Sequence, residues 1–533
     1  MKLRSRSVVR TFISLVAVVA ATAMTSSLAQ QSGGEVVFAV PREADMLDLH
    51  VGSSRYDLVA AAQIYDTYLF LSPEGEFLPW LAEEVTVNDD ATQYTIRLRP
   101  GVVFHDGTPL NAEAVKFNFD RIVDPATASA AAVGDMGSYS GSEVVDELTL
   151  LVNFEEPFPS FWYALSDWRA GGPHSPTAIQ ADPAGYRFKP VGTGPFRFVS
   201  WTLGDRIVLE RNPDYAWPRP GTSHEGPAYL EGVTFRTIAE DQSRLVSLRN
   251  GEIDGMLRVA PQDVAGLKSD SNFTVVEATL PGSGVIIVVN ANKSPTNDLA
   301  FRQALLHVSS PALIARVGYF NAWPPHLGSV LSPPNPGFVD LSGTYSYDIE
   351  EARRLLDEGG WVPGPDGIRV KDGERAELVY IGFPSPETTR TVELIQANLQ
   401  PLGVSITIRE LDSGAIQAAR QAGEHNLAHL TFIYKDAGFL RTLFHSENIG
   451  RGWNFVQLPD PELDQMLEAI QETSDVAARN AIVADVQSYM LEQAYLLPAV
   501  YQHTVNAYRS DVQGAESYPV YGEAPYFYDT YKD

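Results

Sequence analysis

Cysteine is absent from all 533 residues of the chain. This absence excludes disulfide bonds, a thiol nucleophile and thiolate metal ligands, and it also removes the lipobox thiol through which a bacterial lipoprotein is anchored. The fold must therefore be stable through its hydrophobic core. A chain of this length can bury such a core, and its length is typical of two to four domains or lobes.

Basic residues are also scarce, because 39 lysines and arginines stand against 67 aspartates and glutamates, which gives a formal net charge of −28. A chain with this balance offers no basic surface to displace counterions from phosphates, so nucleic acid is not expected as a partner. The acidic charge has two interpretations, a preference for cationic solutes or simple solubility, because net charge does not identify a ligand.

The apolar run near the amino terminus, residues 12–24, is shorter than the roughly 20 residues that span a membrane. A small-residue site, Ser27-Leu28-Ala29, follows it, and four basic residues precede it: Lys2, Arg4, Arg6 and Arg10. This pattern predicts a secretory signal peptide over residues 1–29, with a permanent anchor as the alternative. We therefore expect a mature protein that is free in the periplasm.

Motifs for catalysis are missing as well. The chain has no Gly-x-Ser-x-Gly elbow and no Walker loop, and the strand predicted after Gly192 and Gly194 stands where a phosphate loop needs a helix. His425 and His429 have the spacing of zinc ligands on a helix, but Asn426 replaces the glutamate of a metalloprotease, and a strand is predicted there. We expect no enzyme activity, cofactor or metal, with a secreted hydrolase as the alternative.

Residues 77–121 carry the clearest local pattern, which is strand, turn, strand, turn and helix. Tyr94, Ile96 and Leu98 alternate with polar residues, as expected for a strand with one buried face. Asn111 is placed to cap a helix that begins after it. Alone, this pattern predicts only that helices and strands are mixed.

The second half of the chain predicts an α/β unit. The apolar run 285–290 is typical of a strand buried on both faces, and it is expected to carry the chain into a second lobe. Helices are predicted to begin at Ser310, Asp348, Asp460 and Asp475, with Ser310 as an amino-terminal cap and Asp348 in a capping box. A strand over 496–501 is expected to return the chain to the first lobe. Two such crossings predict a hinge.

Several of these segments together resemble one family. Leu81-Ala82-Glu83, the strand 94–99 and the segment 101–112 match, in order and spacing, the fingerprint of the family 5 extracellular solute-binding proteins, which include oligopeptide, dipeptide and nickel receptors of ABC importers. The turn 192–196 and the helix 298–305 resemble later family segments. The resemblance covers nearly all of the expected mature chain.

The resemblance implies a mixed α/β, two-lobed periplasmic binding protein fold with an extra subdomain on the first lobe and a hinge of two crossing strands. The expected first lobe comprises residues 31–70, 186–285 and 505–533. The expected extra subdomain is 71–185, and the expected second lobe is 286–504.

The resemblance also implies a function without covalent chemistry. A monomer would capture a small solute between its lobes and deliver it to an ABC permease in the inner membrane, which a separate ATPase drives. A short peptide is the expected solute. Oligosaccharides, opine-like conjugates and nickel or haem chelates remain alternatives, and a chaperone-like periplasmic binder is a further one.

The resemblance places one candidate contact. Asp436 falls on the aspartate that pairs with the ligand's α-ammonium group in peptide receptors, although Ala437 replaces the usual proline. A structural role for that aspartate is the alternative. The complete set of candidate ligand-binding residues is Asp436, Trp453, Asn454, His445, Tyr434, Trp168, Arg169 and Tyr56.

Overall fold

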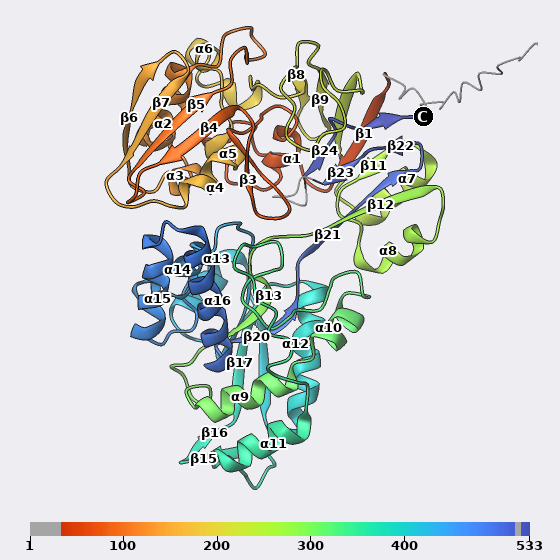
Figure 1. Ribbon diagram of the computed structural model, residues 1–533. Coiled ribbons are helices and arrows are strands. Elements are labelled where there is room, and N and C mark those ends of the chain that lie inside the picture. The colour runs from red at the N-terminus through yellow and green to blue at the C-terminus, as the bar shows by residue number, and fades with distance from the viewer. Residues whose placement is uncertain (1–32, 518–523) are drawn as a thin grey trace, which may run out of the picture.

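The computed structural model describes residues 33–517 and 524–533, which form two lobes that lie one above the other in Figure 1. The predicted two-lobed α/β fold is confirmed. The predicted signal peptide over 1–29 lies outside the described residues. In the part of the chain that is described, no helix has both the length and the apolar character needed to cross a membrane.

A seven-stranded sheet organises the first lobe, and it is built from both ends of the chain. Strand β1, from the start of the described chain, pairs in parallel with β10 and β11, while β21, from near the carboxyl end, lies between β11 and β12. The strand order is β12 (Phe273–Thr279), β21 (His503–Arg509), β11 (Gly255–Met256), β1 (Glu35–Val40), β10 (Gly232–Thr237), β9 (Arg206–Arg211) and β8 (Phe196–Thr202).

The extra subdomain of the first lobe contains an antiparallel four-stranded sheet, with the order β4 (Ala82–Val87), β5 (Gln93–Leu98), β7 (Thr149–Phe154) and β6 (Tyr139–Asp146). Helix α2 (Ala112–Val123) packs against it, and the predicted cap is confirmed because Asn111 accepts a hydrogen bond from the Ala114 amide at 2.9 Å. One continuous core joins this subdomain to the seven-stranded sheet. The two parts therefore form one lobe.

The remaining elements of the first lobe are short. Strands β2 (Leu69–Leu71) and β3 (Phe77–Pro79) form a hairpin. The helices are α1 (Asp57–Ala61), α3 (Ala132–Asp135), α4 (Phe161–Leu165), α5 (Trp168–Gly171), α6 (Pro176–Ala181), α7 (Asp241–Asn250) and α8 (Pro261–Lys268).

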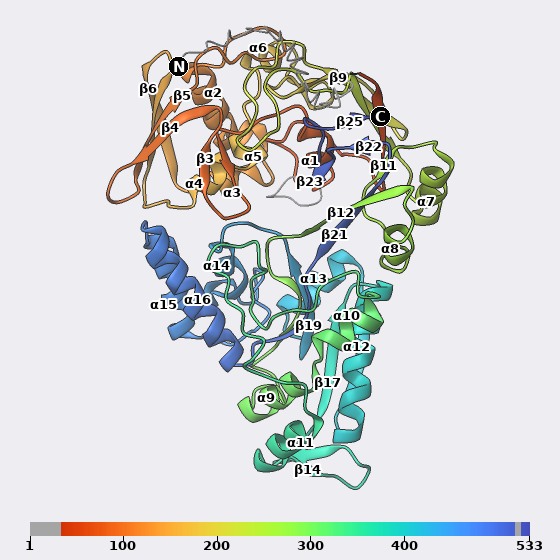
Figure 2. The same ribbon diagram turned by 45° about the vertical axis from the view of Figure 1, so that its right-hand side comes forward.

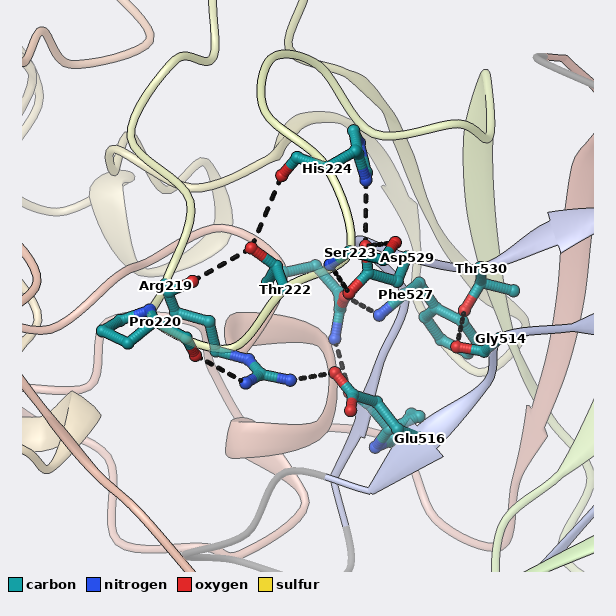
Figure 3. A network of polar contacts seen from close by, with 12 residues as sticks. Arg219, Pro220, Thr222, Ser223, His224, Gly514, Glu516, Phe527, Asp529 and Thr530 are labelled. Atoms are coloured by element: carbon teal, nitrogen blue, oxygen red, sulfur yellow. Dashed lines mark hydrogen bonds and ion pairs between the residues drawn. The ribbon is translucent and has the colours of Figure 1, made fainter. Parts of the chain in front are cut away.

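The carboxyl-terminal tail completes the first lobe through the polar network in Figure 3. Asp529 accepts hydrogen bonds from the Ser223 amide at 3.1 Å, the Ser223 hydroxyl at 2.6 Å and His224 Nδ1 at 2.9 Å. Arg219 forms an ion pair with Glu516 in the same network. Short strands of the tail pair in two ribbons, β22 (Val512–Gln513) with β25 (Tyr531–Lys532) and β23 (Glu516–Ser517) with β24 (Pro525–Tyr526).

A five-stranded sheet forms the centre of the second lobe, with the order β18 (Ser405–Glu410), β17 (Glu377–Gly382), β19 (Leu427–Phe432), β13 (Gly284–Val289) and β20 (Leu496–Val500). Every residue of β13 is buried, as predicted for a strand covered on both faces. Its two neighbours, β19 and β20, both run antiparallel to it. The apolar run thus marks a central strand.

Helices cover both faces of this sheet, as Figure 2 shows. The four predicted helix starts and the caps predicted at Ser310 and Asp348 are confirmed. The side chains of Ser310, Asp348, Asp460 and Asp475 each accept a hydrogen bond from a backbone amide of the first helical turn. The helices are α9 (Leu299–Val308), α10 (Pro311–Gly318), α11 (Ile349–Glu358), α12 (Pro386–Leu399), α13 (Ser413–Gln421), α14 (Phe439–Phe444), α15 (Pro461–Glu472) and α16 (Val476–Glu492). A small sheet joins β14 (Val362–Pro363), β15 (Arg369–Lys371) and β16 (Glu374–Arg375).

Two adjacent segments carry the chain between the lobes. Residues 280–283 connect β12 to β13, and residues 501–502 connect β20 to β21 (Figure 1). The Leu280 amide donates a hydrogen bond to the Gln502 carbonyl at 2.9 Å, so the two crossings are tied together. The predicted pair of crossings is present. The first crossing comes just before strand β13 and the second just after strand β20, so neither crossing lies within a strand. The exact domain boundaries stay a prediction.

The tail network supplies a stability test. We expect Asp529→Ala to lower the free energy of unfolding by about 1–3 kcal/mol, because three donors lose their acceptor. Asp511→Ala, which removes a half-exposed partner of Arg509, should cost less than about 1 kcal/mol. Urea unfolding measures both, and equal effects of the two substitutions would contradict a structural role for the tail.

Candidate solute-binding site

The loop 433–438, between β19 and α14, reaches from the second lobe into the first. The Tyr434 hydroxyl donates to a carboxylate oxygen of Asp135, and Lys435 Nζ donates to the Ser166 carbonyl at 3.2 Å. Ser160 Oγ donates to Asp436. Three consecutive residues of this loop therefore contact the extra subdomain of the first lobe.

Asp436 also forms an ion pair within its own lobe. Its Oδ1 lies 2.6 Å from Arg479 Nη2 on α16, and both side chains are almost fully buried. Arg479 Nε donates to the Ile470 carbonyl at 2.9 Å, and the guanidinium lies over the Tyr163 ring. Asp436 thus neutralises a buried cation in this structure. A contact between Asp436 and a ligand ammonium stays a prediction.

Charged groups of both lobes meet around Lys435. Its Nζ lies 3.8 Å from Asp167 Oδ2, and its side chain is buried. Burial lowers the pKa of Lys435 to about 8, against the opposing effect of Asp167 and Asp135. Burial, and after it the nearby Asp167, raises the pKa of Asp135 to about 7. The lobe interface therefore contains groups that titrate near neutral pH.

A first cavity of about 990 Å³ lies between the extra subdomain and the second lobe, on the side of α14 and α15. Carboxylates outnumber cations on its walls, which fits an acceptor of positive charge. Its acidic lining residues are Asp135, Glu156, Asp167, Asp436, Glu468 and Glu472, and its basic ones are Arg169, Lys435 and Arg441.

A second cavity of about 350 Å³ lies between the lobes on the side of α10 and α12. Thr431 lines it, whereas the next residue, Phe432, lines the first cavity. The two cavities therefore lie on opposite faces of β19. The second cavity also receives Tyr56 and Arg258 from the first lobe and Trp323 from the second.

The structure distributes the predicted site residues over several places. Tyr434, Asp436 and Arg169 all line the first cavity, while Tyr56 lines the second. Trp168 has 0% of its surface exposed and belongs to the core of the first lobe. The Trp168 side chain is therefore packed inside the first lobe in this conformation, and its contact with a solute stays a prediction.

The other three predicted residues lie outside the lining of both cavities. Trp453 is 40% exposed, and its ring lies 6.1 Å from that of Phe432. Asn454 is buried, and its amide donates to the carbonyls of Phe444 at 2.7 Å and His445 at 3.1 Å. His445 is itself buried and directly precedes the helical turn Ser446–Asn448. These contacts assign Asn454 a structural role in the loop after α14.

Two groups of histidines have the composition of metal sites. His425 Nε2 donates to the Phe455 carbonyl at 2.7 Å, while His429 lines the second cavity. Asp48, His50 and His174 form a buried cluster in the first lobe, but Arg121 donates to the first two, and the imidazole rings stack at 3.9 Å. Nearly parallel rings cannot direct their nitrogen lone pairs at one ion, and the guanidinium repels a cation. Both groups fit a structural role better than metal binding.

Several site residues have no local signature in the sequence. Asp135 ends the short helix α3, Ser160 directly precedes α4, and Arg258 follows a two-residue strand. Only the tertiary fold brings them to the lobe interface. Lys435 lies beside Asp436, which the sequence identifies as a candidate site residue. This proximity is the sequence signal from which a role for Lys435 can be predicted.

Comparison with known proteins agrees with this geometry. The model of the family described as bacterial extracellular solute-binding proteins, family 5 Middle, matches residues 76–451. The chain belongs to this family of bacterial extracellular solute-binding proteins.

The relatives cover almost the whole chain. The glutathione-binding protein GsiB of Escherichia coli (strain K12) is 25% identical over 514 residues, which cover 94% of this chain and 95% of that protein. The substrate-binding protein CtaP of Listeria monocytogenes has a TM-score of 0.81 at 21% identity, over 94% of this chain and 99% of its own. DppA of Helicobacter pylori, solved with the peptide STSA, has a TM-score of 0.72 at 24% identity, over 94% and 98%.

The protein is therefore a substrate-binding component of an ABC importer, which binds a solute and delivers it to a permease, and it is not an enzyme. Both expectations from the sequence are confirmed. The two structural relatives share the fold of this chain.

The buried Asp436–Arg479 pair gives a test of its structural role. We expect Asp436→Ala to cost about 3–5 kcal/mol of unfolding free energy, because it leaves Arg479 buried without its counter-charge. The double substitution Asp436→Ala with Arg479→Met should recover most of this loss. Glu424→Ala, at a half-exposed ion pair, is the control. A loss below about 1 kcal/mol in Asp436→Ala, measured by denaturant unfolding, would contradict the structural role.

Buried histidines predict acid sensitivity. Burial lowers the pKa of His425 to about 4, and Arg420 and Lys293 act in the same direction. A folded-state pKa below the unfolded value of about 6.5 gives stability that is present above pH 6.5 and is lost as the pH falls toward 4.

Between pH 7 and pH 5 we expect the wild type to lose about 2 kcal/mol more unfolding free energy than His425→Gln. Carboxyl groups with raised pKa values, such as Asp66 and Asp135, act in the opposite direction but are present in both proteins. Urea unfolding at the two pH values measures the difference, and equal losses would show that His425 does not titrate as described.

Proposed function

We propose that the solute is a short peptide, bound in the first cavity with its α-ammonium group toward the carboxylates of that cavity. The observation that carries the proposal is the excess of acidic over basic residues on the cavity walls, six against three. A charge-assisted pair with one of these carboxylates would hold one end of a peptide and would discriminate against uncharged solutes.

The loop 433–438 supports the same function by coupling the solute to lobe closure. Tyr434, Lys435 and Asp436 contact the first lobe and also line the first cavity. A solute that binds there adds interactions with both lobes, so it stabilises the arrangement in which these contacts form. Closure about the two crossing segments then presents a loaded protein to the permease.

The proposed place of action is the periplasm. The basic, apolar and small-residue pattern of residues 1–29 supports export by a cleavable signal peptide, and the missing lipobox cysteine supports a protein free of a lipid anchor. The family is extracellular, which agrees with this proposal.

A thermal-shift screen tests the solute class. Glutathione and the tetrapeptide Ser-Thr-Ser-Ala represent peptides, and an oligosaccharide, an opine and a nickel–histidine complex represent the alternatives. We expect a peptide to raise the Tm, since a solute at 100 times its Kd adds about 2.7 kcal/mol of stability.

Mass spectrometry of the released solute is the control for chemistry, and it should return the peptide unaltered. The N-acetylated form of the same tetrapeptide should bind at least about 10-fold more weakly, because it lacks the ammonium group. Binding of only a sugar, an opine or a metal complex would contradict the proposal. Cleavage of the peptide would favour a hydrolase, and equal affinity for long unfolded chains would favour a chaperone.

A further inference from the structure

The second cavity is built from both lobes and has walls of different character. The first lobe contributes Tyr56 and Arg258, and strand β19 of the second lobe contributes His429 and Thr431. It lies on the opposite face of β19 from the first cavity. A ligand in the second cavity therefore occupies a different place from the positively charged group that the carboxylates of the first cavity would bind.

Arg258 is held on the first-lobe wall by an unusual backbone. Its φ angle is 60°, in the left-handed region that residues other than glycine seldom adopt. The Arg258 amide donates to Asn506 Oδ1 at 3.1 Å, and Arg258 Nη1 donates to the Tyr56 hydroxyl at 3.0 Å. Strained backbones of this kind persist where the surroundings fix them, often at binding sites. The guanidinium is thus positioned at the cavity.

Two further arginines surround the same tyrosine. The guanidinium carbon of Arg42 lies 5.7 Å from the centre of the Tyr56 ring, and that of Arg55 lies 5.3 Å from it. With Arg258, three of the few cations of an acidic chain gather at one aromatic residue. Arg42 is paired with Asp45 at 2.8 Å, so its charge is compensated, and Arg258 is the arginine of this group that lines the second cavity.

A buried cation lies behind the second-lobe wall. Arg420 on α13 is 2% exposed, and its guanidinium carbon lies 5.6 Å from the centre of the Phe383 ring and 5.2 Å from that of the Phe455 ring. Within residues 33–517 and 524–533, no carboxylate forms an ion pair with it. Burial and, after it, the Arg420 guanidinium lower the pKa of His429, so this imidazole is neutral near pH 7. Positive potential therefore reaches the cavity from the second lobe as well.

The remaining lining is compatible with an anion beside an apolar group. Asp241 is paired with Arg244, and Glu387 lies 3.5 Å from Arg390, so both acids have cationic partners. The rings of Tyr319 and Trp323 stack at 4.7 Å and form an aromatic wall. A cavity with a cation at one wall and stacked aromatic rings at another matches a carboxylate carried on an apolar side chain.

We propose that the second cavity is a binding site for a carboxylate attached to an apolar group, with Arg258 and the Tyr56 hydroxyl as the donors to that carboxylate and the Tyr319–Trp323 stack as the apolar contact. The proposal goes beyond the peptide function, because it concerns a different cavity and needs no ammonium group on the ligand.

N-acetylphenylalanine and its carboxamide are suitable probes, since both have the aromatic group, neither has an ammonium group, and only the first has a carboxylate. Saturation-transfer NMR titrations measure the affinity of the full-length mature protein for each. We expect the acid to bind at least about 10-fold more tightly than the amide, as for a hydrogen bond to a charged group.

Arg258→Gln should abolish this preference, with the affinity for the acid falling to that for the amide. Arg258→Lys, which keeps the charge, should retain part of it. Arg249→Gln, on the exposed end of α7, is the matched control and should bind as the wild type does. The thermal unfolding of each variant confirms that it is folded.

Two results would overturn the proposal. One is equal binding, or no binding, of the acid and the amide to the wild type. The other is an undiminished preference for the acid in folded Arg258→Gln. Because neither probe is a peptide, these outcomes are independent of the peptide screen, which tests only the proposed function.

Discussion

The structure depends on the two crossings that join its lobes. Each lobe has its own sheet, and the described chain passes between the sheets only at 280–283 and 501–502. The bond from the Leu280 amide to the Gln502 carbonyl keeps the two passages side by side. A narrow connection of this kind permits rotation of one rigid lobe against the other and limits sliding. The cavities between the lobes can therefore change shape while each core stays packed.

The loop 433–438 connects the rotation of the lobes with the recognition of a solute. Its polar residues reach the first lobe, and the ion pair between Asp436 and Arg479 fixes the loop to α16. Because the contacts across the interface are charged or hydrogen-bonded, they form only when groups from both lobes are aligned. A solute in the first cavity would contact groups that already hold the lobes together. Its binding would therefore stabilise the closed arrangement of the lobes, and no covalent bond would be made or broken.

The local structure could be predicted from the sequence, whereas the site could be predicted only in part. Asn111 and Asp348 cap their helices as expected, because capping depends on residues a few positions apart. Trp168 was expected at a ligand, yet it is a core residue, since nothing in its neighbours reveals on which side of the lobe it lies. Asp135 and Arg258 were missed, because they reach the interface through tertiary packing alone and a left-handed φ angle has no sequence signature outside glycine.

Single-molecule fluorescence energy transfer tests lobe closure most directly. The chain has no cysteine, so Val145→Cys in the first lobe and Val476→Cys in the second, both at exposed positions, would accept the only two dyes. A second pair within the first lobe, Val145→Cys and Leu203→Cys, is the control. Closure predicts that a bound peptide shifts the efficiency of the interlobe pair to a single, different value and leaves the control pair unchanged. An interlobe efficiency that stays the same while calorimetry shows the peptide bound would contradict the account.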